Sequence, residues 1–356
     1  MEEKNTELTM LDLMHQAAFR VENGIITEVN ATAAQYMLQP GTAVAPLLYA
    51  GQEDYAEFSQ GGLYVSLQLQ GHVCGATVAR IQTADIFVLE EYAQSQQLKA
   101  LALAALELRA PLSGMISTSD LMLPELNQNG SPALQEYAAQ LNRRMMQMQR
   151  MICNMSDAGF YCQNSTVPKE LIDICSILEE QLSRAAQALQ AAGITLCYQL
   201  PNERIFISAN PELLERAVYN LISNAAKFSP ANGVISVHLA RKGDRLALSV
   251  TDSGCGIAHK GDVFTRYLRQ PGLEDSRNGI GLGMVMVRCA AAAHGGAVLI
   301  DTPDEQGTRV TMTLTISQSK DTLVRTPVMR IDYAGERDHC LLELSDVLPA
   351  KLYQTK

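Results

Sequence analysis

The sequence predicts a multidomain α+β protein with a small N-terminal α/β unit, a central antiparallel helical hairpin and a C-terminal α/β sandwich. Its length of 356 residues exceeds that of one ordinary domain. Strand-like apolar runs in the first part of the chain give way to helical periodicity near residue 90, and both patterns mix after about residue 165. Apolar residues form 47% of the chain and charged residues 19%, a balance typical of packed cores.

Residues 1–90 are predicted to form the small α/β unit. Its strand-like runs lie at 18–21, 24–29, 63–69 and 76–81. The turn Glu22-Asn23-Gly24 between the first two runs is a strong signal for a β-hairpin. We therefore expect a hairpin, then short helices, then two further strands.

Residues 91–165 are predicted to form two long helices separated by a turn-like segment at 124–132. Their apolar residues recur at alternating steps of four and three, which is typical of a helix bundle. The first stripe is Leu101, Ala105, Leu108, Leu112, Met115 and Ser119, and the second is Leu134, Ala138, Leu141, Met145, Met148, Ile152 and Met155. A two-helix hairpin cannot enclose such a seam alone, so we expect two copies to form a four-helix bundle.

Residues 166–317 alternate helical and strand-like patterns, which predicts a mixed sheet with helices on one face. The expected helices lie at 170–192, 211–227 and 282–294, and the expected strands near 194–199, 205–208, 234–240, 245–251, 297–301 and 308–315. A C-terminal tail, 318–356, follows. Within it, 328–333 and 340–344 could form another hairpin, and the sequence assigns this tail no role.

Charge and cysteine content limit the classes of function. The formal charge of −10 and the pI near 5.2 argue against nucleic acid as a main partner, because phosphate neutralisation needs surplus Lys and Arg. The eight cysteines are scattered without a Cys-x-x-Cys pair, which is typical of a reducing compartment. The first residues are acidic and polar, and no apolar run approaches 18 residues, so we expect a cytoplasmic protein without a membrane span.

Three motifs in a fixed order carry the candidate chemistry. Asn220, Asn224 and Lys227 project from one face of a predicted helix, and amide oxygens with an ammonium group suit a hard cation and the phosphates that it bridges. The second motif is a carboxylate at a strand end followed by two glycines, namely Asp252, Gly254 and Gly256. The third is the alternating run Gly279, Gly281 and Gly283 at a helix start, where backbone N–H groups can face a phosphate.

Each motif is weak alone, but together, with Gly307 and Thr308 after them, they resemble the catalytic ATP-binding domain of sensor histidine kinases. That domain belongs to the gyrase, chaperone and mismatch-repair ATPase superfamily, and the resemblance covers about 165–317. It implies Mg-ATP, with Asn224 on the metal and Lys227 on phosphate. It also implies that Asp252 holds adenine, that the five glycines and Thr308 shape the pocket, and that 258–278 form a mobile lid anchored by Phe264 and Tyr267.

One residue at this site differs from the hydrolytic members of the superfamily. Those members place a glutamate general base where this chain has Asn220. An amide cannot take a proton from water, so efficient ATP hydrolysis is disfavoured.

The run Glu107-Leu108-Arg109 followed by Pro111-Leu112 resembles the dimerisation and phosphotransfer helix of the same family. The family's phosphoacceptor histidine would stand at Leu106, with Glu107 polarising it, and leucine has no nucleophile. The six histidines are His15, His72, His238, His259, His294 and His339, so none lies between residues 88 and 168. Some family members also carry Thr or Asn four residues after the histidine for dephosphorylation, and this chain has Ala110 there.

The N-terminal run Asn23-Gly24-Ile25-Ile26 with its neighbouring strands loosely resembles a PAS sensor domain. Taken together, the resemblances imply a two-component signalling protein that binds Mg-ATP but cannot phosphorylate itself at the usual histidine, and so acts as a regulatory pseudokinase. Two alternatives stay open. One is an active kinase that phosphorylates a His, Ser or Thr on a partner in trans, and the other is a docking module with a vestigial ATP site. The expected partners are ATP, a second copy of the chain through 91–165, and a response regulator or partner kinase.

Overall fold

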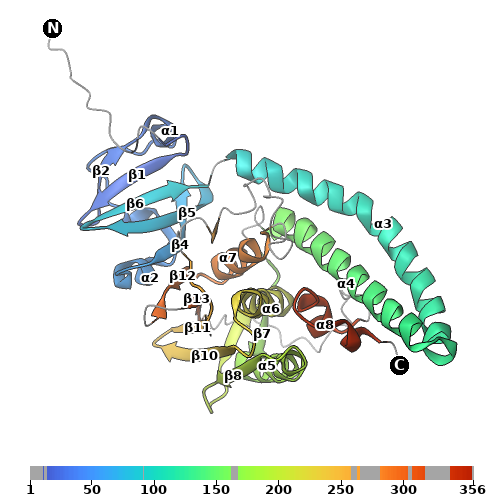
Figure 1. Ribbon diagram of the computed structural model, residues 1–356. Helices are drawn as coiled ribbons and strands as arrows, with labels where there is room; N and C mark the ends of the chain where they lie inside the picture. Colours follow the sequence, from blue (N-terminus) through green and yellow to red (C-terminus); the bar gives the residue numbers. More distant parts are fainter. Residues whose placement is uncertain are drawn as a thin grey trace, which may run out of the picture.

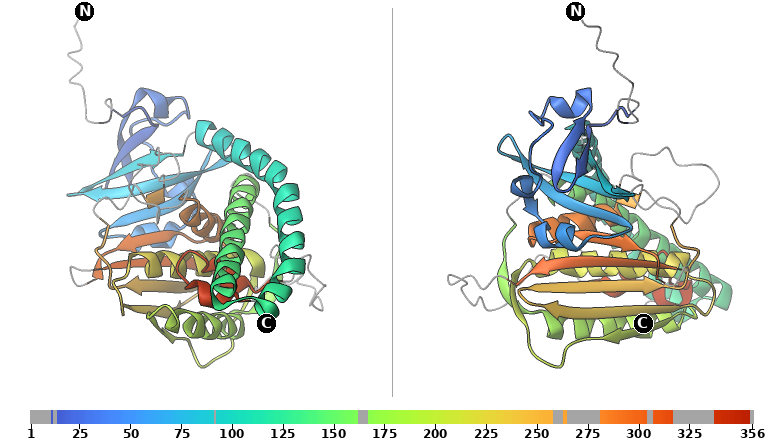
Figure 2. Two further views of the ribbon diagram at one scale, coloured as in Figure 1. Left: turned by 45° about the vertical axis from the view of Figure 1, so that its right-hand side comes forward. Right: turned by 90° about the vertical axis from the view of Figure 1, so that its left-hand side faces the viewer.

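The computed structural model describes residues 11, 14–90, 92–161, 167–257, 263–264, 281–303, 307–316 and 337–354. A sheet of eleven strands runs through the molecule (Figure 1). Helices of the C-terminal half cover one face of this sheet, and two long helices form the outermost layer on the same side (Figure 2). The architecture is therefore mixed α/β, as the sequence predicts.

The N-terminal unit combines antiparallel strands with short helices. Its elements are β1 (Ala18–Glu22), β2 (Ile25–Val29), α1 (Ala31–Ala34), the 3₁₀ helix η1 (Ala45–Leu47), β3 (Leu48–Ala50), α2 (Gln52–Glu57), β4 (Gly62–Leu69), β5 (His72–Ile81) and β6 (Ala84–Leu89). The predicted hairpin is confirmed, because β1 pairs with β2, and Asn23 and Gly24 at its turn have φ of 51° and 76°. The two further strands are also confirmed as β4 and β5, and the sequence missed β3 and β6, which join the same sheet.

The central hairpin consists of α3 (Tyr92–Asn129) and α4 (Pro132–Tyr161). The turn predicted at 124–132 is wrong in extent, because α3 continues through Pro124 to Asn129 and the connection is confined to residues 130 and 131. Pro111 and Pro124 both lie inside α3, where a proline removes a helical hydrogen bond. In Figures 1 and 2, α3 curves around the outer side of α4, and the two prolines account for part of that bend.

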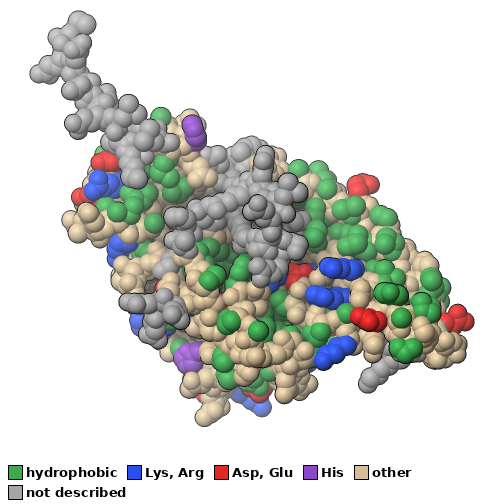
Figure 3. All heavy atoms as spheres, in the orientation of Figure 1, with side chains coloured by type: hydrophobic (Ala, Val, Ile, Leu, Met, Phe, Trp, Pro, Cys, Tyr) green, Lys and Arg blue, Asp and Glu red, His purple; other side chains and the backbone are tan. Residues whose placement is uncertain are grey.

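The predicted apolar stripe of the hairpin divides into a buried half and an exposed half. The buried residues recur every seven positions and are Ala105, Leu112 and Ser119 on α3 with Ala138, Met145 and Ile152 on α4. The exposed stripe residues are 43–49% exposed and are Leu108, Met115, Leu134, Leu141 and Met148, whereas Met155 at the end of the stripe is buried. Apolar side chains accordingly line the outer surface of the hairpin in Figure 3.

Part of α3 also meets a length and composition test for crossing a membrane. Within Gln96–Leu126 a stretch of 18 residues has a mean hydropathy of 1.3, and 11% of that stretch is buried. A single helix of this kind is weak evidence, because an uncovered bundle helix has the same composition.

The C-terminal unit contains the sheet and helices that surround the candidate site. Its elements are β7 (Glu170–Asp173), α5 (Ile174–Gln190), β8 (Thr195–Gln199), β9 (Phe206–Ala209), α6 (Pro211–Phe228), β10 (Val234–Lys242), β11 (Arg245–Asp252), α7 (Gly283–Ala293), β12 (Val298–Asp301) and β13 (Thr308–Thr315). The helix expected from residue 170 starts instead at Ile174, because β7 pairs with β9 and Asp173 caps the helix by accepting a hydrogen bond from Cys175 N. The mixed sheet is confirmed: β10 runs parallel to β8 and antiparallel to β11.

The N-terminal and C-terminal sheets join edge to edge. The strand order is β2-β1-β6-β5-β4-β12-β13-β11-β10-β8, with β3 paired to β4. The joining pair is β4 with β12, in which Tyr64 lies opposite Val298. Side chains reinforce the junction: Arg245 on β11 forms ion pairs with Glu53 and Asp54 on α2, at 2.8 Å each. The N-terminal unit is therefore fixed to the C-terminal unit by backbone and charge contacts.

The described part of the tail forms a short helix, α8 (His339–Glu343), and a 3₁₀ helix, η4 (Ala350–Tyr353). The strand considered at 340–344 is thus wrong, because Asp338 caps a helix there by accepting from Leu341 N at 3.0 Å. Its supposed partner, 328–333, lies outside the described residues. α8 lies between α4 and α6, and its Leu342 and Leu344 are buried.

Candidate functional site

The helix α6 supplies the first set of predicted site residues. It begins at Pro211 and is capped by Asn210, whose Oδ1 accepts from Leu213 N at 2.9 Å. Asn224 and Lys227, one turn apart, line the cavities described below. Asn220 is only 1% exposed: its Nδ2 donates to the carbonyl of Arg216, and its Oδ1 accepts from Arg150 at 3.1 Å. Asn220 also lines the larger cavity, so all three residues of the predicted stripe reach it, but the amide of Asn220 is already bonded to Arg150 of α4 and to the Arg216 carbonyl.

Two adjoining cavities lie beside this end of α6. The smaller has a volume of about 280 Å³ and the larger about 630 Å³. Both are lined by Asn224, Lys227, Gly281 and Gly283. A ligand with a flat apolar part and an anionic part could therefore occupy both at once.

The smaller cavity has apolar walls and one carboxylate. The Oδ1 of Asp252 accepts from Gly254 N at 2.8 Å and from Thr308 N at 3.2 Å. Burial raises the pKa of Asp252, and these two hydrogen bonds oppose that rise. Among the described residues no hydrogen bond reaches its Oδ2, which is available to accept from an amino group of a base. The apolar walls include Leu221, Ile257, Met284 and Val310.

Two glycines place backbone where a side chain would not fit. Gly281 has φ of 82°, a conformation that favours glycine. At Gly283 a Cβ would lie 2.8 Å from the Asn220 Oδ1, so only glycine lets α7 begin this close to α6. Gly256 lines the smaller cavity and Gly254 holds Asp252, whereas Gly279 lies outside the described residues.

The predicted lid, 258–278, is described only at residues 263 and 264. Phe264 is buried, and its ring packs against Tyr64 of β4 with centroids 5.3 Å apart. Arg288 of α7 donates to the Phe264 carbonyl at 3.3 Å and lies over the Tyr64 ring. The other predicted anchor, Tyr267, lies outside the described residues. Phe264 therefore contacts the N-terminal unit, a contact that the sequence did not indicate.

The larger cavity is strongly basic. Arg143, Arg144 and Arg150 reach it from α4, and Lys227 reaches it from α6. In Figure 3, Lys and Arg side chains gather beside the hairpin. Such a set suits an anion such as a phosphate group. The apolar periodicity of α4 predicts only a buried seam, so the sequence gives no signal for these arginines.

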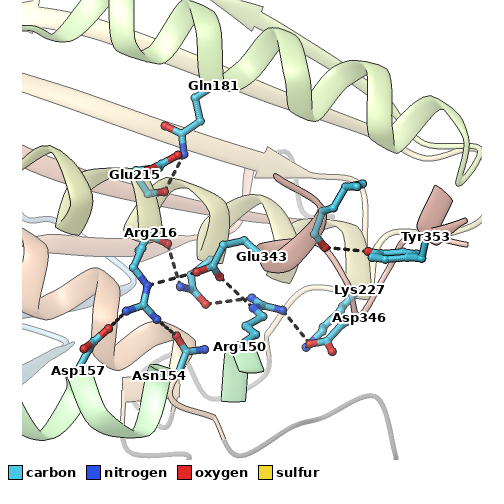
Figure 4. A network of polar contacts seen from close by, with 12 residues as sticks. Arg150, Asn154, Asp157, Gln181, Glu215, Arg216, Lys227, Glu343, Asp346 and Tyr353 are labelled. Carbon is cyan, nitrogen blue, oxygen red and sulfur yellow. Dashed lines mark hydrogen bonds and ion pairs between the residues drawn. The ribbon is translucent and has the colours of Figure 1, made fainter. Parts of the chain in front are cut away.

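The tail inserts two carboxylates into this basic region, as Figure 4 shows. Glu343, whose side chain has no exposed surface, accepts from Arg150 Nε at 3.0 Å and from Arg216 Nε at 3.2 Å. Asp346 contacts Lys227 Nζ at 2.6 Å and Arg150 Nη1 at 2.8 Å. Arg216 also pairs with Asp157 of α4 and donates to Asn154 at 2.5 Å. The network therefore ties the tail, the hairpin and α6 together.

The residue in the expected acceptor position lies on the surface. Leu106 on α3 is 53% exposed, and Glu107 beside it is also exposed. Arg109 donates to Ser156 of α4 at 3.1 Å, which links the two helices. Ala110 is exposed and offers no side-chain hydroxyl or amide.

The donor set limits how a metal ion could be held. Among the described residues no group of three or more His, Cys, Asp or Glu side chains could bind a metal. Mg²⁺ commonly uses one or two protein ligands and completes its shell with phosphates and water. The amide oxygen of Asn224, between the two cavities, fits that mode of binding.

One family model matches the part of the chain that contains α6 and most of this site. Residues 209–318 match the family model of the histidine kinase-, DNA gyrase B-, and HSP90-like ATPase. The adaptive-response sensory kinase SasA of Synechocystis sp. is 28% identical over 240 residues, which is 64% of this chain and 62% of SasA. The sensor protein KdpD of Escherichia coli is 27% identical over 62% of this chain and 25% of KdpD. The histidine protein kinase DivJ of Caulobacter vibrioides is 27% identical over 59% of this chain and 36% of DivJ.

The matches thus span between a quarter and about three fifths of these relatives. Among solved structures, full-length ShkA in complex with AMPPNP has a TM-score of 0.49 and 21% identity, covering 62% of this chain and 46% of ShkA. Histidine kinase ThkA in complex with response regulator TrrA has a TM-score of 0.42 and 14% identity, covering 85% of this chain and 96% of that one. Scores below 0.5 support no statement about how the domains are arranged.

Proposed function

The chain carries an ATP-binding domain of the histidine kinase family, and from that premise we propose that it is a signalling pseudokinase that binds Mg-ATP without phosphorylating itself on a helix histidine. The observation that carries the proposal is the contrast between Asn224, Lys227 and Asp252 at the two cavities and a leucine at the acceptor position. The relatives are sensor kinases by name, so a role in two-component signal transduction follows from the family.

Nucleotide binding would use both cavities. The Asp252 Oδ2 accepts from the adenine amino group in the smaller cavity, while Asn224 and Lys227 face the phosphates at the mouth of the larger one. Mg²⁺, held by Asn224 and the phosphates, would neutralise charge between them. Asn220 is bonded to Arg150 and to a backbone carbonyl, and an amide cannot activate water, so we expect little ATP hydrolysis.

The acceptor helix lacks the chemistry for self-phosphorylation. Leu106 is exposed at the position where the family resemblance places the histidine, and a leucine cannot attack a phosphate. Ala110 likewise cannot orient a water for dephosphorylation of a response regulator. We propose that the nucleotide state regulates partners through the hairpin instead.

A second copy of the chain is the proposed partner of the hairpin. The exposed half of its apolar stripe, made of Leu108, Met115, Leu134, Leu141 and Met148, is spaced like the buried half. Pairing of two such hairpins would cover both exposed halves in a four-helix bundle. We prefer this to a membrane position for α3, because α4 presents the same exposed spacing.

The N-terminal unit is proposed to be a PAS-like sensor. Its hairpin, short helices and returning strands occur in the order that the resemblance implies. We propose a cytoplasmic location, which the scattered cysteines without a Cys-x-x-Cys pair support.

One preparation of the purified chain tests the proposal. Calorimetric titration with Mg-ATP should show binding, and incubation with radiolabelled ATP should leave no acid-labile phosphate on the protein. An Asn224→Ala variant serves as the binding-deficient control. Acid-labile phosphate on the wild-type chain would contradict the proposal.

A second candidate is a kinase acting in trans on a histidine of a partner kinase. The same exposed half-stripe could pair with a related hairpin that keeps its histidine. Labelled phosphate on such a partner, lost in the Asn224→Ala variant, would favour this candidate over the pseudokinase.

A further inference from the structure

A carboxylate of the tail, Asp346, pairs with two cationic side chains, Lys227 and Arg150, in the cavity proposed to hold the nucleotide's phosphates. The Asp346 Oδ2 lies 2.6 Å from Lys227 Nζ and 2.8 Å from Arg150 Nη1 (Figure 4). All three residues line the larger cavity, which adjoins the base pocket through Asn224 and Gly281. An anion already occupies the place where the nucleotide's phosphates would arrive.

We infer that the carboxylate of Asp346 and the outer phosphates of the nucleotide compete for Lys227 and Arg150, so that the tail gates nucleotide binding and the hairpin residue Arg150 becomes a phosphate ligand. This inference rests on the proposed binding of ATP. Carboxylate and phosphate oxygens form the same short, charge-assisted hydrogen bonds with ammonium and guanidinium groups. An arriving phosphate can therefore replace the carboxylate without any other group changing its partner.

The two tail carboxylates are suited to different roles. Glu343 is fully buried and holds Arg150 Nε and Arg216 Nε, so it fixes the guanidinium groups in place. The side chain of Asp346 is 32% exposed and can turn toward solvent. Arg150 also keeps its hydrogen bond to Asn220 through Nη2. Exchange therefore releases one nitrogen of Arg150 while the other two stay bonded.

The ionisation of Asp346 matches this role. Burial would raise its pKa, but the charges of Arg150 and Lys227 outweigh burial and hold the pKa below its usual range. The carboxylate is thus charged at neutral pH, where a phosphate would compete with it. Arg143 and Arg144 line the same cavity and add positive charge for the incoming anion.

The test compares two isosteric changes in the same tail. Asp346→Asn removes the competing charge, whereas Asp338→Asn changes a residue that caps α8 and pairs with Arg184 away from the cavity. Dissociation constants for Mg-ATP and for adenosine are measured by calorimetry on the full chain. We expect Asp346→Asn to bind Mg-ATP roughly tenfold more tightly, the order of one charge-assisted hydrogen bond, with adenosine unchanged. Asp338→Asn should match the wild type for both ligands.

A measurement on the wild-type chain guards against a folding defect in the variant. Hydrogen exchange of residues 339–348 should increase on addition of Mg-ATP and stay unchanged with adenosine. Equal Mg-ATP affinity in Asp346→Asn and wild type, or weaker binding as expected if Asp346 were a metal ligand, overturns the inference. If the wild type binds adenosine but Asp346→Asn binds Mg-ATP no more tightly than the wild type, the competition between Asp346 and phosphate is refuted while the proposed nucleotide binding stands. If the wild type binds neither ligand, the proposed function fails with it.

Discussion

The ATP-binding domain and the helical hairpin differ in which side chains they expose. At α6 the polar side chains Asn224 and Lys227 line cavities, and the large apolar residues of the same helix are buried except Phe228. On the hairpin, half of the apolar stripe is exposed, and the surface position expected to carry a nucleophile carries Leu106. The first unit brings the candidate nucleotide-binding residues together, whereas the described residues of the second leave apolar side chains exposed and carry leucine at the expected acceptor position. This contrast motivates the proposal that the chain binds nucleotide and acts through association.

The largest expected effect comes from restoring the acceptor. Leu106→His places an imidazole beside Glu107 on the exposed side of α3, and labelling from radiolabelled ATP should rise from background to a clear acid-labile signal. The double variant Leu106→His with Asn224→Ala should stay unlabelled. A Leu106→His chain that binds Mg-ATP yet remains unlabelled would mean that the hairpin has lost more than its histidine.

Next in size is the loss of base recognition. Asp252→Asn keeps an oxygen for Gly254 N and Thr308 N but turns an NH₂ group toward the adenine amino group, so two donors face each other. We expect ATP affinity to fall about 100-fold, the order of one lost charged hydrogen bond with an unmatched donor. Asp244→Asn, an exposed aspartate before β11, is the calorimetric control. Unchanged ATP affinity in Asp252→Asn would mean that the Asp252 carboxylate does not bind the adenine amino group.

Association through the exposed half-stripe should respond to charge. Met115→Glu with Leu141→Glu introduces two carboxylates into the proposed bundle interface, and we expect the dimer to weaken at least tenfold because buried charges are costly. Analytical ultracentrifugation measures the change. Leu121→Glu alters an exposed leucine of α3 outside that stripe and should leave the dimer intact. A monomeric wild type would contradict the bundle.

The last prediction concerns the stability of the ATP-binding domain and changes neither ligand binding nor association. His294 is buried, its Nε2 accepts from Asn210 N at 3.0 Å, and burial lowers its pKa to about 4. Above pH 6.5 the imidazole is neutral in both folded and unfolded states. Between pH 6.5 and 4 the unfolded chain takes up a proton that the folded chain does not, so the free energy of unfolding falls as pH falls.

We expect this loss to be about 2 kcal/mol between pH 7 and pH 5. Urea unfolding at the two pH values measures it. His294→Gln should flatten the dependence, while His238→Gln, at an exposed histidine of β10, should leave it as in the wild type. If the free energy of unfolding depends on pH equally in His294→Gln and in the wild type, groups other than His294 cause that dependence.

Local patterns in the sequence predicted the elements that surround α6 but not the contacts of the tail. The helix at 211–228 carries its own cap and its own periodicity, so its cavity face could be read directly. The run Cys340–Leu344 is apolar except for Glu343 and only five residues long, and a run of that length does not distinguish a strand from a helix. The cap at Asp338 was the available signal for a helix. Arg150 and Glu343 are separated by 193 positions, and no local pattern could pair them.

The pairing of β4 with β12 also covers a strand edge of the ATP-binding domain. An uncovered strand edge presents a row of free N–H and C=O groups that another chain can join. Here β4 covers β12, so the N-terminal unit shields the ATP-binding domain against adding strands from neighbouring molecules. A fragment that begins after residue 90 would uncover that edge, and we expect it to aggregate where the full chain does not.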